Sequence, residues 1–107
     1  MDLQNAPIDL EHLARQTMSD PELQREILSI FVKQMTDKIE QLQKQMSELD
    51  ALAHSIKGSA RGVGAWQVAN VAEQLERGKG PRADVIILLA RAMEDAVHHA
   101  RLLLETS

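Results

Sequence analysis

The chain has 107 residues, of which 44% are hydrophobic, with one Phe, one Trp, no Tyr and no Cys. This is the size of a single domain, and a core limited to Leu, Ile, Val, Ala and Met is typical of helices rather than strands. The lack of Cys excludes a disulfide framework, zinc fingers and thiol catalysis, and a net charge of −4 without a basic block argues against a nucleic-acid partner.

No apolar run approaches the ~20 residues of a membrane span, and the chain opens with neither a basic region nor an apolar signal segment. We therefore expect a soluble, unprocessed, cytoplasmic protein made of one domain over residues 1–107. Residues 1–8 are expected to be a loose lead-in. A short covering helix should follow, with Asp9 as its N-cap and its end near Thr17.

The second helix is expected to begin at a capping box, in which Ser19 is followed three residues later by Glu22, with Pro21 in the first turn. It should run towards Gln45. We place the break before the next helix at Ser47. The apolar residues of this region step by threes and fours, as in a helix packed nearly antiparallel in a bundle, at Leu28, Phe31, Met35, Ile39, Leu42, Met46 and Leu49.

The third helix is expected to end in the glycines at 62 and 64, because Gly is common where a helix closes in a left-handed turn. At about 100° per residue its apolar residues form one stripe. They are Leu49, Leu52, Ala53, Ile56, Ala60 and Val63.

A fourth helix should start at Ala65 and end in the loop 77–81, where cations, glycines and a proline follow one another. The last helix is expected over residues 82–105. The apolar faces of these two helices are Val68, Val71, Ala72 and Leu75, and Ile86, Leu89, Met93, Val97, Ala100 and Leu104. The pattern predicts an all-α fold, an antiparallel four-helix bundle with a short N-terminal covering helix.

One patch of the third helix offers chemistry that a plain helix does not need. His54 falls outside the apolar stripe, and Lys57, Gly58 and Arg61 share its face within one or two turns. Gly58 costs about 1 kcal/mol relative to Ala in a helix interior, which suggests that something must approach the helix closely there. A neutral imidazole can attack an electrophile, and a nearby cation can hold phosphoryl oxygens. For Arg61, a plain solvated position is an equally good interpretation.

Other residues leave alternatives open. Asp50 could orient the His54 ring or pair with the cations, although capping beside Ser47 is the preferred interpretation. Trp66 either anchors beside the glycine turn or lies partly exposed near the His54 face. Asp95 and His98 have the spacing of a metal motif, but the second copy that di-iron bundles require is missing, so we expect no metal. The glycines are not followed by Gly-Lys-Ser/Thr, so we expect no nucleotide binding.

The segment Ala53-His54-Ser55-Ile56-Lys57-Gly58-Ser59-Ala60, followed by Val63-Gly64-Ala65, closely resembles the signature of histidine-containing phosphotransfer (HPt) domains of bacterial multistep phosphorelays. The resemblance continues through Val68-Ala69 to Glu73-Gln74-Leu75-Glu76 and covers about a quarter of the chain. It implies a four-helix bundle with an exposed phosphoacceptor histidine and no kinase or ATP-binding activity. The break near Ser47 departs from the plainer turn of many relatives.

Residue by residue, the resemblance implies that His54 is the phosphoacceptor, Lys57 the cation one turn later and Gly58 the gap that admits a partner. Glu76 matches a position where some relatives carry a carboxylate near the histidine. The implied partners are response-regulator receiver domains and a sensor histidine kinase, with Mg²⁺ supplied by the receiver and no cofactor of the chain's own. We expect a monomer. The rival from another class is a phosphorylation-independent helical adaptor that binds a kinase or a response regulator.

Overall fold

The computed structural model describes residues 6–44 and 48–106, and within them the chain forms five helices. These are α1 (Leu10–Gln16), α2 (Pro21–Lys44), α3 (Leu49–Val63), α4 (Trp66–Glu76) and α5 (Arg82–Glu105). The predicted helix order is confirmed, and the boundaries of the last two helices agree with the loop of cations, glycines and proline between them.

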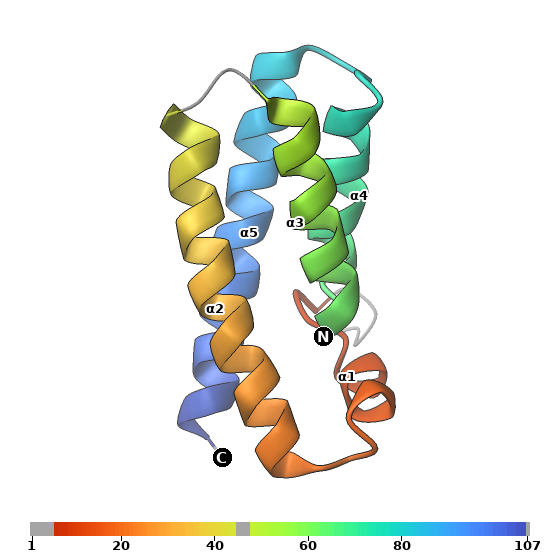
Figure 1. Cartoon of the computed structure of the whole chain (residues 1–107), viewed down its shortest axis with the longest axis vertical. Helices are drawn as coiled ribbons and strands as arrows, with labels where there is room; N and C mark the ends of the chain where they lie inside the picture. The colour runs from red at the N-terminus through yellow and green to blue at the C-terminus, as the bar shows by residue number, and fades with distance from the viewer. Residues whose placement is uncertain (1–5, 45–47, 107) are drawn as a thin grey trace.

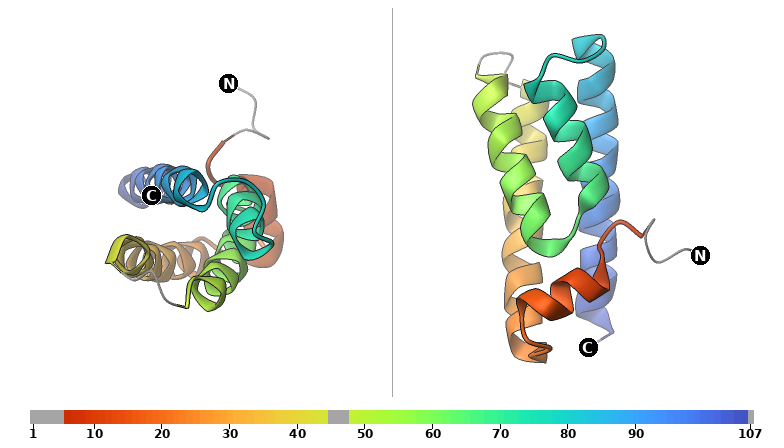
Figure 2. Two further views of the ribbon diagram at one scale, coloured as in Figure 1. Left: turned by 90° about the horizontal axis from the view of Figure 1, so that it is seen from above. Right: turned by 90° about the vertical axis from the view of Figure 1, so that its right-hand side faces the viewer.

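The helices α2 to α5 run alternately up and down and form an antiparallel four-helix bundle (Figure 1). α2 packs on α3 and α5, and α4 packs on the same two helices from the other side (Figure 2). α1 lies crosswise near the end of the bundle where α3 stops, and it contacts α3. The predicted fold class, with a short covering helix, is therefore confirmed.

The core is made of aliphatic and Met side chains from all the helices, with Phe31 as its aromatic member among the described residues. Within the described residues the predicted stripes lie inward, apart from a few partly buried positions such as Leu52, Val71 and Ile86. Met46, which was predicted to continue the stripe of the second helix, lies outside the described residues. α5 also buries Val85 and Ala96, which widen its predicted face. Because each stripe is confined to one side of its helix, the opposite sides remain free to carry polar chemistry.

The N-terminus of α2 is capped differently from the prediction. Asp20, not Ser19, provides the cap: its Oδ1 accepts hydrogen bonds from the backbone N–H groups of Glu22 at 3.0 Å and Leu23 at 3.4 Å. Ser19 has a left-handed backbone, with φ of 59°, whereas an N-cap residue usually has an extended one. The capping box of Ser19 and Glu22 was therefore wrong, although the helix starts where expected.

The predicted break between the second and third helices at Ser47 lies outside the described residues. After Ser47 the described chain resumes at Glu48, which is the N-cap residue of α3. Glu48 has φ of 63°, and its side chain makes no capping hydrogen bond. Asp50 is in the first turn of α3, and its Oδ1 lies 3.5 Å from Arg82 of α5. Asp50 therefore has a weak contact across the bundle end, and its side chain makes no described contact with His54.

The end of α3 is held by the N-terminal segment. Gly64 has φ of 78°, and a Cβ there would lie 2.9 Å from Cβ of Asp9, so both its conformation and its space require glycine. The N–H of Asp9 donates to the Gly64 carbonyl at 2.9 Å. Asp9 also caps α1, as predicted, by accepting from the N–H of His12. The turn is therefore a docking point for α1.

Trp66 belongs to this same docking point. Its indole N–H donates to Oδ2 of Asp9 at 2.9 Å, and this bond is the main reason that the pKa of Asp9 is below its ordinary value. The His12 ring packs edge-on against Trp66 at 4.7 Å and hydrogen-bonds through Nε2 to the Arg61 carbonyl at 2.8 Å. The interpretation that anchors Trp66 beside the glycine turn is confirmed. His12 helps to hold α1 in place.

Ile8 is a core residue rather than part of a loose lead-in. Its side chain is fully buried, and its N–H donates to Nδ1 of His99 on α5 at 3.1 Å. Nδ1 can accept this bond only when it carries no proton. Burial, and secondarily the neighbouring His98, lower the pKa of His99 below its ordinary value of 6.5.

This arrangement predicts that folding stability falls on acidification. Because the folded-state pKa of His99 is lowered, the unfolded chain takes up the proton first, so stability decreases as pH falls below about 6.5 and levels off below the folded-state pKa. The loss should be of the size of one hydrogen bond, about 0.5–1.5 kcal/mol. Urea unfolding at pH 7.5 and 5.5 measures it. His99→Gln should flatten the slope in this window, and an unchanged slope would contradict the assignment.

Candidate functional site

α3 presents His54 on its outer side because its apolar stripe faces inward. Leu49, Ala53, Ile56, Ala60 and Val63 are buried, and the His54 side chain is 72% exposed. An exposed imidazole can meet a second macromolecule directly. The helix thus fixes the ring on the surface without covering it.

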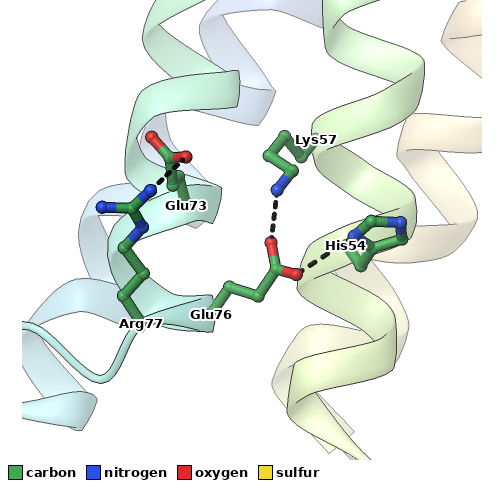
Figure 3. Close-up of polar contacts among 5 residues, drawn as sticks. All are labelled: His54, Lys57, Glu73, Glu76 and Arg77. Atoms are coloured by element: carbon green, nitrogen blue, oxygen red, sulfur yellow. Dashed lines mark hydrogen bonds and ion pairs between the residues drawn. The ribbon is translucent and has the colours of Figure 1, made fainter.

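A single carboxylate joins His54 and Lys57. Glu76, the last residue of α4, places Oε2 3.0 Å from Nδ1 of His54 and Oε1 2.7 Å from Nζ of Lys57 (Figure 3). The hydrogen bond to the ring and the ion pair to the ammonium use the two oxygens of one side chain, so the ring and the ammonium are held in a fixed relation. Because Glu76 is on a different helix, the site forms only when α3 and α4 pack together.

The contact with Glu76 determines where the imidazole proton lies. An ionised carboxylate only accepts hydrogen bonds, so Nδ1 of His54 must donate and carries the proton. In the neutral ring, Nε2 then has the lone pair. The nitrogen farther from Glu76 is therefore the nucleophilic one.

The charge state of Glu76 is fixed by the same contacts. The bond from Lys57 is the main reason that the pKa of Glu76 lies below its ordinary value of 4.5; burial opposes this shift, and the bond from His54 supports it. Because the folded-state pKa is lowered, the stabilising contribution is present above pH 4.5 and is lost as pH falls through the lowered pKa. Near neutral pH the carboxylate is ionised and holds both partners.

Lys57 is less accessible than a surface lysine. Its side chain is only 14% exposed, and its ammonium group contacts the buried Oε1 of Glu76. The lysine stem thus lies along the α3–α4 contact, while the charged end remains within one helical turn of the imidazole. This position allows the ammonium to support negative charge that arrives at the ring.

Gly58 leaves an open space one turn after His54. It is exposed within α3, and an added Cβ would meet no heavy atom within 4 Å. The packing of the chain itself does not require a glycine here, unlike at Gly64. The free backbone is instead available to a molecule that approaches His54.

Arg61 is not part of the contacts around His54. The residue is exposed, and within residues 6–44 and 48–106 its guanidinium pairs with no carboxylate. Its backbone carbonyl accepts from His12, which places this turn of α3 near α1. The predicted set thus separates into His54 and Lys57, which both contact Glu76, an open glycine at 58, and Arg61, which has no described ion pair.

No group of three or more His, Cys, Asp or Glu side chains that could hold a metal ion occurs in the described part of the chain. Asp95 and His98 belong to no such group. The described helices also include none that is long and apolar enough to cross a membrane.

A protein-family model described as "Hpt domain" matches residues 26–101, which is well over half of the chain. The chain therefore belongs to the Hpt domain family, whose members carry out histidine phosphotransfer in phosphorelays. Hpt domains are phosphotransfer carriers rather than kinases, and they interact with receiver domains and histidine kinases. Comparisons with curated proteins and with solved structures gave no significant match.

Proposed function

We propose that His54 accepts a phosphoryl group from the phosphoaspartate of a receiver domain, or from a sensor histidine kinase, and passes it to another receiver. The observation that carries this proposal is the contact of Glu76 with Nδ1, which leaves the Nε2 lone pair available on an exposed ring. The chain acts as a carrier in the cytoplasm, as a monomer, and without nucleotide.

In the proposed step, Nε2 attacks the phosphorus of the acyl phosphate. The N–P bond forms as the P–O bond to the partner's aspartate breaks, and the aspartate leaves as a carboxylate. The proton on Nδ1 remains in its bond with Glu76, so the step needs no base. Glu76 balances the positive charge that the ring gains on phosphorylation.

Lys57 and the partner share the stabilisation of the phosphoryl oxygens. Phosphoryl transfer depends mainly on positioning and on charge stabilisation, and Lys57 is the cation that shares the Glu76 carboxylate with the ring. We assign Mg²⁺ to the receiver, because Mg²⁺ needs clustered oxygen ligands. Gly58 lets the surface of the receiver approach the α3 backbone.

Transfer of label tests the proposal. A receiver domain phosphorylated with labelled acetyl phosphate is mixed with the protein, and the label should move to the protein in a form that acid removes and alkali does not, as expected for an N–P bond. If binding to the receiver is detected but no label moves, the chain is a phosphorylation-independent adaptor instead.

A further inference from the structure

The surface of α3 around His54 borders α4 on one side and α2 on the other, and the described polar contacts on the two sides differ. On the side of α4, Lys57 and Glu76 form an ion pair. Between α3 and α2, the described side-chain hydrogen bond is uncharged: the Ser59 hydroxyl donates to Oε1 of Gln34 at 3.3 Å. A partner that meets His54 therefore finds an ion pair towards α4 and a neutral hydrogen bond towards α2.

On the side towards α2, the surface contains a groove of about 250 Å³ between α2 and α3. Ile27, Ile30 and Phe31 line it from α2, and Gly58 and Gly62 line it from α3. None of its lining residues carries a formal charge. Ile30 is 49% exposed, so its side chain is accessible to a partner. The groove thus offers an accessible apolar wall beside the α3 backbone.

Gly62 is the feature that the fold does not explain. It lies inside α3, is exposed, and has none of the left-handed backbone that makes glycine necessary at Gly64. A Cβ at Gly62 would meet nothing within 4 Å. A glycine inside a helix lowers its stability relative to alanine, so Gly62 does not contribute to the stability of the isolated protein. Its effect is to keep the groove open next to Gly58.

We propose that Gly62 and Ile30 select the partner, by receiving an apolar side chain of the receiver domain that exchanges phosphoryl groups with His54. This inference rests on the proposed function. Any protein whose aspartate reaches the His54 ring must cover the next turn of α3, at Gly58, and the groove continues from Gly58 to Gly62. An uncharged groove favours an apolar side chain over a charged one, because a buried charge would have no counter-charge there.

Two variants test the groove, each with a matched control on α5. Gly62→Leu fills the groove, and Ala83→Leu places the same side chain at an exposed position of α5. Ile30→Ser removes the apolar wall, and Ile87→Ser changes an isoleucine of similar exposure, 53% against 49%. Two phosphodonors are used for each protein: receiver domains phosphorylated with acetyl phosphate, and phosphoramidate, which is too small to need docking.

Gly62→Leu and Ile30→Ser should each lower kcat/KM from the best receiver by about tenfold, mainly through KM, as is usual when a central interface residue is changed. Their labelling by phosphoramidate should stay within about twofold of the unmodified protein, and both controls should behave like it. Gly62→Ala should raise the Tm and lower kcat/KM by less than Gly62→Leu does, because it adds only one methyl group.

Unchanged transfer from every receiver in Gly62→Leu would overturn the inference, as would an equal loss with both donors, which would indicate damage at His54 instead. A change of sedimentation with unchanged transfer would also overturn it, because the occupant of the groove would then be a second copy of this chain. If the unmodified protein takes label from neither donor, the proposed function itself fails, and this result is distinct from a failure confined to Gly62.

Discussion

His54→Gln is expected to reduce phosphoryl acceptance to background. Gln has no nucleophilic nitrogen at the position of Nε2, so no N–P bond can form there. The fold should remain intact, because the His54 side chain is 72% exposed and changes at such positions usually alter the unfolding free energy by less than about 0.5 kcal/mol. Label transferred from a phosphorylated receiver, counted after gel separation, measures the effect.

The matched control is His98→Gln, which changes an exposed histidine on α5. This variant should accept label at the rate of the unmodified protein. Retention of label by His54→Gln, or its loss from His98→Gln with the fold intact, would contradict the assignment of the acceptor.

Glu76→Gln is expected to slow transfer to His54 by about tenfold, the lower end of the roughly 10–100-fold loss seen when the hydrogen-bond partner of a metal-ligating histidine is changed. A neutral amide can donate to Nδ1 as well as accept from it, so it no longer fixes the proton there, and it no longer pairs with Lys57. The low end applies because the exposed ring keeps other orientations available. Single-turnover transfer kinetics give the rate, and ¹⁵N NMR of the imidazole gives the tautomer.

Glu73→Gln is the matched control, because Glu73 is almost one turn earlier on α4 and pairs with Arg77 at 3.4 Å instead of with His54 (Figure 3). It should change neither the rate nor the tautomer. An unaltered tautomer in Glu76→Gln would contradict the positioning role, even if the rate fell, since a purely structural defect could lower the rate alone.

The fold was predictable because each helix of the bundle follows its own apolar period. The stripe from Ala53 to Val63 and the turn at Gly64 depend on residues close together in the sequence, and both are confirmed. The predicted start of α2 is confirmed, but the predicted capping residue, Ser19, is wrong. Ser19 and Asp20 are both good capping residues, and only the backbone angles distinguish them.

The contacts between distant residues were not predictable from such patterns. Glu76 is 22 residues from His54, and its approach depends on how α3 and α4 pack. Only the family resemblance pointed to it, by placing a carboxylate near the histidine in some relatives. The bond from Ile8 to His99 spans 91 residues and had no signal in the sequence. The bond from His12 to the Arg61 carbonyl involves a backbone group, which every residue has, so no residue type could reveal it.

In the proposed mechanism, Nε2 of His54 carries the phosphoryl group while the proton on Nδ1 stays in its hydrogen bond with Glu76. Long-range ¹H–¹⁵N NMR of the protein, phosphorylated by a receiver and kept at neutral pH, tests it most directly. We expect phosphorus coupling at Nε2 of His54 and a protonated Nδ1. Phosphorus coupled to Nδ1, or a phosphoryl group on any other residue, would contradict it.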